Sequence, residues 1–495
     1  MITGIRNGKF TFILLLVISA ITLFFFLFAH PTVIISGDDW GNLIVRRGLY
    51  PQWGITNPIK VMPEIGYPFF SRLSIKLIMP FGFGFLESFS IITAIFITIL
   101  MAVLFNQLYK LFAIDFESGF YRAYLLVAIE YSLIFLLFRK SGNHESLYML
   151  WEVNITCFYH YIAPALINSA LAIYIIRKWD SLSIDHFKRN GIIFSLSLIL
   201  FSYISIYSSL FANVILAVVC GVCCLVIFID SRLSLLSTLR KCPLQILTLL
   251  MWVVSLIFEA NGGRANSVAN AKLDIDGSIK VFGDLISQIN PVFIYSGIFL
   301  IIYGLFISVK TLLSRAQKRN AIIFIITFIS ALIVTVALLI LCSKAGSYYA
   351  ARPVAMWGVF LFSSACAMMA LDYVSNKYKK HANIILSLIV MLMIYKNTSS
   401  DSTLKESINL NLSYEKAINI SQGIIDQVVE ADKNNKGRMI LIVPKADSVN
   451  NWPFPIYGGT FINDSLKKYK FISNNMYIEV KPDPEVNEKM GIPFK

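Results

Sequence analysis

Charged residues are scarce in this sequence: Asp, Glu, Lys and Arg together make up 15% of it, whereas hydrophobic residues make up 57%. A soluble protein of this length would need a mostly polar and charged surface. The apolar residues are instead grouped in runs of roughly 17 to 23, the length that crosses about 30 Å of hydrocarbon at 1.5 Å per residue. The composition therefore excludes a soluble fold and predicts an α-helical polytopic membrane protein.

Residues that bind metals or form disulfides are also few. The 5 histidines are scattered, and most of the 7 cysteines lie inside apolar runs. Cys220, Cys223 and Cys224 share one such run, but a zinc site needs four converging ligands, so we interpret them as packing residues. We predict no metal site, no disulfide framework and no cofactor, and leave open a divalent cation at an acidic site.

Basic residues exceed acidic ones, 43 against 29, which gives a formal net charge of +14. In a membrane protein such residues gather in short loops, where they fix the orientation and meet anionic lipid head groups. We therefore expect membrane lipids as partners and no nucleic acid. The sequence has no convincing internal repeat, which disfavours transporter folds built from inverted halves.

Hydrophobicity predicts about eleven transmembrane helices. Arg6 and Lys9 precede the first run, which is long and lacks a small-residue cleavage site, so we interpret it as an uncleaved span. Basic residues in alternate loops place the N-terminus in the cytoplasm and, with an odd number of spans, the C-terminus outside. The predicted spans are 10–29, 87–109, 120–138, 158–176, 191–208, 210–230, 245–259, 293–309, 321–342, 353–372 and 382–396.

The pattern divides the chain into a membrane domain, 1–396, and a soluble outer domain, 397–495. The membrane domain has three large outer loops. In the soluble domain we expect a small α/β fold, with a helix at 414–430 and two strands around an aromatic, turn-rich segment. The outer loops are 30–86, 139–157 and 259–292, and the strands are 439–443 and 476–480.

The most distinctive polar feature is Gly37-Asp38-Asp39-Trp40, about nine residues beyond the first span. Two adjacent carboxylates are expensive to bury in lipid, so this turn must face the membrane surface or a cavity. Asp38 or Asp39 could act as a general base while its neighbour orients it or holds a cation. Alternatively, the pair marks the start of a helix, where Asp is a good cap and favours the helix dipole.

Several basic residues fall in the same outer loops, and a phosphate ligand would need one or two of them. Arg352 is the preferred candidate, because Tyr349 and other aromatic residues lie beside it in 347–353. The alternative is that these residues contact lipid head groups and that the tyrosines form an interfacial belt. The basic candidates are Arg46, Arg47, Arg72, Lys76, Arg139, Lys140, Lys344 and Arg352.

A third segment, 139–160, combines aromatic and acidic residues that could line a carbohydrate site or form a plain interfacial loop. Glu64 is a comparable candidate in the first outer loop. Glu130 lies inside the third predicted span, where an acid normally faces the bundle interior or a cavity. The chemically relevant residues of the segment are His144, Glu145, Trp151, Glu152, Tyr159 and His160.

This layout resembles the GT-C membrane glycosyltransferases, and the Gly37-Asp38-Asp39-Trp40 turn with an external tail looks most like bacterial serotype-converting O-antigen glucosyltransferases of the Gtr type. The resemblance implies transfer of a sugar, with glucose expected, from a polyprenyl-phosphate carrier to a lipid-linked polysaccharide such as the O-antigen of lipopolysaccharide. It would take place at the periplasmic face of the inner membrane.

Under this resemblance Asp38 or Asp39 matches the first-loop catalytic acid. The substrate-binding candidates are Arg352, Arg72, Arg139, Glu64, Tyr349 and His144. Two alternatives stay open: a flippase or transporter of lipid-linked glycans, and an O-antigen polymerase.

Overall fold

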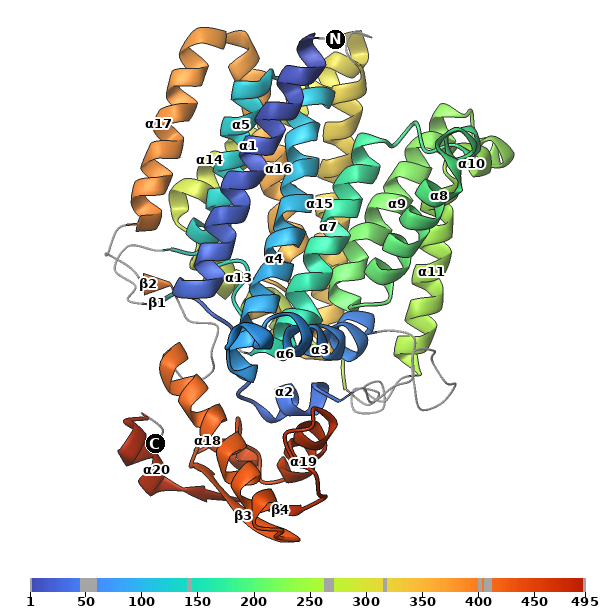
Figure 1. The fold of residues 1–495 in the computed structure, drawn as a ribbon. Coiled ribbons are helices and arrows are strands. Elements are labelled where there is room, and N and C mark those ends of the chain that lie inside the picture. The colour runs from blue at the N-terminus through green and yellow to red at the C-terminus, as the bar shows by residue number, and fades with distance from the viewer. Residues whose placement is uncertain are drawn as a thin grey trace.

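The computed structural model describes residues 2–44, 60–139, 145–152, 154–261, 271–314, 318–398, 403–404 and 412–492. Within these ranges, 10 helices are long and apolar enough to cross a membrane. They run side by side in one bundle, with a small domain below one end of it (Figure 1). The prediction of a polytopic α-helical membrane protein is confirmed.

The expected run 120–138 corresponds to α5, a helix of 17 residues that is shorter than the ten and packs against α17 and α4. The total of eleven spans therefore stays a prediction. The bundle consists of α1 (Ile2–Phe24) with η1 (Phe25–Ala29), α4 (Phe85–Lys110) with η4 (Leu111–Asp115), α5 (Phe120–Leu136), α6 (Ile155–Cys157) with η5 (Phe158–Ile162) and α7 (Ala163–Arg177), α8 (Ile184–Ile206), α9 (Leu210–Asp230), α11 (Pro243–Ala260), α14 (Pro291–Ser314), α15 (Lys318–Ala345), α16 (Trp357–Lys377) and α17 (Lys379–Thr398).

Burial separates central from peripheral helices. The apolar stretch of the α6–α7 span is 89% buried, whereas that of α14 is 11% buried. Exposed leucine, isoleucine and phenylalanine on a peripheral helix would be costly in water, but in a bilayer these faces meet lipid. The apolar stretches of α4, α7, α9 and α16 are more than half buried, so these helices form the centre of the bundle.

Short elements cover the end of the bundle next to the small domain (Figure 1). The first outer loop contributes α2 and α3, and η6 precedes α16. These elements are α2 (Gly37–Asn42), η2 (Met62–Gly66), α3 (Tyr67–Leu77), η3 (Met79–Phe81), α13 (Ile275–Ser287) and η6 (Ser347–Ala351), while α10 (Leu235–Lys241) lies at the opposite end.

The small domain consists of α18 (Tyr414–Lys433), β3 (Arg438–Pro444), η8 (Val449–Asn451), α19 (Gly459–Lys468), β4 (Tyr477–Asp483) and α20 (Pro484–Met490). β3 and β4 are parallel, in register from Arg438 opposite Tyr477 to Pro444 opposite Asp483. The predicted helix 414–430 and both predicted strands are confirmed. A second, minimal parallel pair joins β1 (Glu145–Ser146) to β2 (Thr403–Leu404), which ties the second outer loop to the segment after α17.

The small domain is docked directly on the segment between α1 and α4. The Ser465 hydroxyl donates to the Trp40 carbonyl at 2.7 Å, and the Tyr469 hydroxyl donates to the Leu43 carbonyl at 2.9 Å. The Ser421 hydroxyl donates to the Ile34 carbonyl. Three side chains from α18, α19 and its C-terminal end therefore hold the backbone on both sides of α2.

Candidate functional site

The two aspartates lie in the first turn of α2, whose N-cap is Ser36. The Asp39 carboxylate accepts the backbone N–H groups of Ser36 at 2.9 Å and Ile35 at 3.0 Å, while the Ser36 hydroxyl accepts the N–H of Asp39 at 3.3 Å. This reciprocal arrangement is a capping box, which satisfies backbone donors that the helix itself cannot use.

Asp39 also joins α2 to the second outer loop. Its other carboxylate oxygen accepts the N–H of Thr156 at 2.8 Å, and the side chain is 0% exposed. Burial raises the pKa of Asp39, and the hydrogen bonds from Ser36, Thr156 and Ile35 oppose that rise. For Asp39 the structure therefore agrees with the helix-cap alternative, since its carboxylate is occupied by backbone donors.

Asp38, by contrast, is exposed. The Asp38 carbonyl accepts a hydrogen bond from the Asn42 side chain at 2.8 Å. The Asp38 charge acts electrostatically on Cys157 at the start of the α6–α7 span and on Tyr457 of the small domain. Asp38 thus lies within electrostatic reach of both the membrane bundle and the small domain.

Arg352 lies at the end of η6, within an acidic and aromatic surround. Its guanidinium is 3.6 Å from the Glu152 carboxylate, and the two side chains are 24% and 2% exposed. The guanidinium is 5.1 Å from the centre of the Tyr349 ring and 5.7 Å from that of Tyr161. Such cation–π contacts hold the planar group in place while leaving its edges available to a ligand.

The charge of Arg352 is secured by these neighbours. Burial by itself lowers the pKa of Arg352, but Glu152 and the surrounding groups more than offset that effect and raise it. Tyr349 in turn lies 5.2 Å from Phe211 and 4.5 Å from Tyr348, ring centre to ring centre. Arg352 is therefore a permanent, partly accessible cation at the end of the bundle.

One short segment links the acid and the cation. Asn154 donates from its side-chain amide to the Ser36 hydroxyl at 3.2 Å and accepts the N–H of Cys157 at 2.8 Å. Cys157 lies within the electrostatic reach of Asp38, Glu152 and Arg352. The segment after Glu152 thus fixes the position of Arg352 relative to α2, although the three parts come from distant stretches of the chain.

The remaining predicted residues fall in three different settings. Arg139 is buried and donates to the carbonyls of Lys396 at 3.2 Å and Asn397 at 3.0 Å, so its guanidinium caps the end of α17. Arg72 is exposed on α3 and acts electrostatically on Lys468 and Tyr469 of the small domain. Because its guanidinium donates to these two backbone carbonyls of α17, we leave Arg139 out of the proposed site.

Glu64 is half-buried in η2, which packs against η5. His144 lies outside the described residues, as do Arg46, Arg47 and Lys140. In the parts of the chain that the structure covers, no three His, Cys, Asp or Glu side chains come together in a group that could hold a metal ion.

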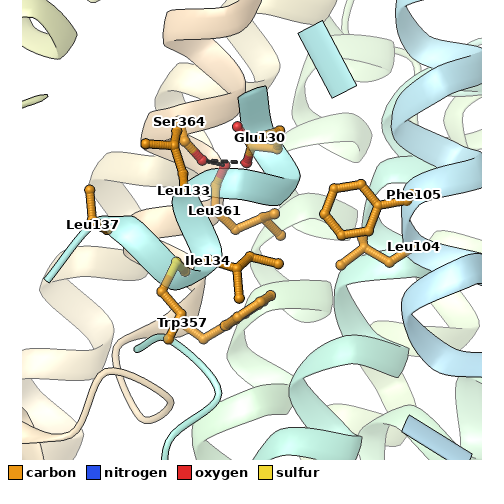
Figure 2. Close-up of a pocket in the computed structure, with 10 residues that line it drawn as sticks. Leu104, Phe105, Glu130, Leu133, Ile134, Leu137, Trp357, Leu361 and Ser364 are labelled. Atoms are coloured by element: carbon orange, nitrogen blue, oxygen red, sulfur yellow. Dashed lines mark hydrogen bonds between the residues drawn. The ribbon is translucent and has the colours of Figure 1, made fainter. Parts of the chain in front are cut away.

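Glu130 faces the interior of the bundle, as expected for an acid inside a span. It accepts a hydrogen bond from Ser364 and lines a cavity of about 20 Å³, room for about one water molecule. Figure 2 shows this pocket, closed by apolar residues of α4, α5 and α16. Too small for a sugar, the cavity is a feature of helix packing and is separate from the Asp38 and Arg352 surface.

Sequence reasoning missed three contributions to this site. It grouped Glu152 with a possible sugar site and did not recognise it as the partner of Arg352, and it did not name Tyr161 at all. The aromatic, turn-rich segment expected between the two strands contains Tyr457, but Tyr457 was not proposed as a site residue. The Asn154 side-chain cap is the one local signal, since Asn before a helical run is a common N-cap.

Comparison of the chain with protein-family models, with curated proteins and with solved structures finds no match.

Proposed function

We propose that this protein is a membrane glycosyltransferase of the GT-C kind. It would transfer a sugar, with glucose expected, from polyprenyl phosphate to O-antigen or another surface polysaccharide at the outer face of the bacterial inner membrane. The observation that carries the proposal is that an exposed carboxylate, Asp38, and a cation held by Glu152, Arg352, lie at the same end of an apolar helical bundle.

The chemistry of the proposed step matches these two groups. Asp38 takes the proton of the acceptor hydroxyl, whose oxygen attacks the anomeric carbon of the donor sugar. The bond between that carbon and the phosphate oxygen breaks, and polyprenyl phosphate leaves with the bonding electrons. Arg352 stabilises the negative charge on the departing phosphate, for which a guanidinium is well suited.

Glu152 and the tyrosines have a supporting part in this scheme. Glu152 orients Arg352 from the buried side and keeps it protonated, while Tyr349 and Tyr161 limit its motion. A lipid-linked donor must approach through the bilayer, and its phosphate sits at the interface. A cation at the end of the bundle is at the depth such a phosphate would reach.

The arrangement of the chain supports the assigned orientation. The N-terminus and the small domain lie at opposite ends of the bundle (Figure 1). The N-terminal end carries ion-paired basic residues, among them Arg177 with Asp115 at 2.6 Å and Arg319 with Asp180 at 2.7 Å. Basic residues favour the cytoplasmic side, which would leave Asp38 and the small domain outside the cytoplasm.

The test is a transfer assay with a lipid donor. Membranes containing the chain would be given polyprenyl phosphate bearing a radiolabelled glucose, together with the host's lipid-linked polysaccharide. We expect label to move to the polysaccharide with the chain present and not with empty membranes. Label that stays on the lipid, or that only crosses the bilayer still attached to its carrier, would favour a flippase instead.

A further inference from the structure

The loop before α19 in the small domain is fitted against the start of α2. The Gly37 N–H donates to the Pro453 carbonyl at 3.0 Å. A Cβ atom at Gly37 would lie 2.4 Å from the Cγ atom of Pro455, so glycine is required for this close approach. The Gly458 N–H closes the loop on the Pro455 carbonyl at 2.8 Å. The loop is therefore held at a fixed distance from Asp38, the next residue along α2.

This contact brings an aromatic surface beside the exposed carboxylate. Tyr457, two residues after Pro455, is 53% exposed, and Ile456 is 50% exposed. The ring of Phe461 lies 6.3 Å from that of Tyr457, nearly perpendicular to it, and supports it from behind. Partial burial raises the pKa of Tyr457, and so does the charge of Asp38, which places the phenol within electrostatic reach of the carboxylate.

We propose that Tyr457 and Ile456 form the binding surface for the acceptor saccharide, and that this surface presents the sugar hydroxyl to Asp38. The inference rests on the proposed function and names the part of the protein that selects its acceptor. An exposed aromatic ring offers a flat apolar face to the C–H side of a sugar, and its hydroxyl bonds to sugar oxygens. A carboxylate beside it accepts a sugar hydroxyl, as the transfer step needs.

The two substrates would then approach from opposite sides of Asp38. Arg352 belongs to the membrane bundle, where a phosphate on a lipid chain arrives, whereas Tyr457 belongs to the domain outside it. The docking bonds from Ser465 to Trp40 and from Tyr469 to Leu43 keep the distance between the two subsites constant. The acceptor site is then shared: the small domain provides Tyr457 and Ile456, and α2 provides Asp38.

The experiment measures saccharide binding directly on the full chain in detergent. The probe is the mixture of oligosaccharides released by mild acid from the host's own surface polysaccharide, observed by saturation-transfer NMR and titrated. We expect Tyr457→Ala to weaken binding about tenfold, the loss expected from one aromatic contact of about 1.4 kcal/mol. Tyr457→Phe should bind more tightly than Tyr457→Ala, because it keeps the ring.

Tyr477→Ala is the matched control, because Tyr477 is 63% exposed on β4 of the same domain and its ring lies under Arg438. It should bind like the wild type. Tyr457→Leu provides a second variant in case Tyr457→Ala elutes as aggregate, and it too should bind weakly. In the transfer assay, Tyr457→Ala should raise the KM for acceptor about tenfold and leave the KM for donor unchanged.

Failure of the two proposals can be told apart. If the wild type transfers no sugar but binds the oligosaccharides, and Tyr457→Ala does not bind them, the saccharide surface stands and the transferase proposal falls. If transfer occurs while Tyr457→Ala and Tyr457→Leu bind and react with acceptor like the wild type, the acceptor surface is overturned. Absence of oligosaccharide binding to the wild type overturns it as well.

Discussion

Asp38 and Asp39 are adjacent in the sequence and lie in opposite environments. Asp39 is fully buried and receives three backbone N–H groups, from Ile35, Ser36 and Thr156. Asp38 is exposed and lies within electrostatic reach of Cys157 in the bundle and Tyr457 in the small domain. Successive residues of a helix point about 100° apart, so the two side chains leave α2 in different directions. Asp39 thus stabilises the start of α2, whereas Asp38 is exposed on the surface of the same helix.

Gly37→Ala tests whether the small domain needs its close contact with α2. The new methyl group would overlap Pro455, so either the domain shifts or the loop deforms. We expect a loss of about 1–3 kcal/mol of stability, as for overpacking elsewhere, and a matching fall in transfer activity. Thermal unfolding in detergent checks this.

Gly423→Ala is the control for that experiment, because a Cβ atom there meets nothing within 4 Å and the residue lies inside α18. It should be neutral or stabilise the protein by about 0.5–1 kcal/mol. Equal melting temperatures for the wild type and Gly37→Ala would show that the docking contact is unimportant.

The sequence was sufficient to predict the membrane bundle, because lipid imposes one solution on long apolar runs. It also predicted α18, β3 and β4 from helical and alternating periodicity. It could not decide which aspartate faces inward, because that depends on Thr156 and on a loop more than 400 residues from Gly37. The pairing of Glu152 with Arg352 joins two segments 200 residues apart, and nothing in either segment specifies the other.

The role of Arg139 could not be predicted from its neighbouring residues in the sequence either. An arginine at the end of a span looks the same in the sequence whether it binds a phosphate or caps a neighbouring helix. Its position was settled by the packing of α5 against α17, which places two carbonyl groups before its guanidinium. Packing between helices therefore gives Arg139 backbone partners, and we prefer Arg352 as the phosphate ligand.

Arg352→Lys should reduce transfer strongly. Lysine keeps the charge but lacks the planar fork and the stacking on Tyr349 and Tyr161. We expect kcat/KM for the lipid donor to fall about 10- to 100-fold, the range for losing a charge-assisted hydrogen bond worth about 1.5–3 kcal/mol. Arg438→Lys, at an exposed ion pair in the small domain, is the control and should leave kcat/KM unchanged. Similar kinetics for both variants would contradict the role of Arg352.

Arg139→Ala should destabilise the protein without altering catalysis by the molecules that fold. The change leaves the carbonyls of Lys396 and Asn397 without their charged donor, at a cost of about 1.5–3 kcal/mol. Melting temperature should fall, while kcat per folded molecule and the KM for donor stay at wild-type values. A raised KM for donor with normal stability would return Arg139 to the substrate site.

We predict that the protein loses stability in acid because its buried His30 is neutral in the folded state. Its ring stacks on Phe25 at 4.7 Å and meets Tyr148 at 5.4 Å, and burial lowers the pKa of His30 to about 4 from an ordinary 6.5. The unfolded chain therefore binds a proton between about pH 6.5 and pH 4 that the folded chain does not. The free energy of unfolding therefore falls by about 3 kcal/mol in all as the pH drops through that window. Above about pH 6.5 the contribution of neutral His30 is fully present.

His30→Phe keeps the stacking and removes the titration. Its stability should change less than that of the wild type between pH 7 and pH 4.5, as followed by thermal unfolding in detergent at each pH. Parallel pH curves for the two proteins would mean that His30 is not buried in its neutral form.

The most direct test of the central claim compares Asp38→Asn with Asp39→Asn in the labelled-donor transfer assay, with each rate divided by the amount of monodisperse protein. Asp38→Asn should fold like the wild type and lose at least about 100-fold in kcat, the contribution of a general base. Asp39→Asn should lower the melting temperature, because an amide cannot accept all the N–H groups that the carboxylate accepts, while its folded fraction retains transfer. Full activity of well-folded Asp38→Asn, or a normally stable but inactive Asp39→Asn, would contradict the account.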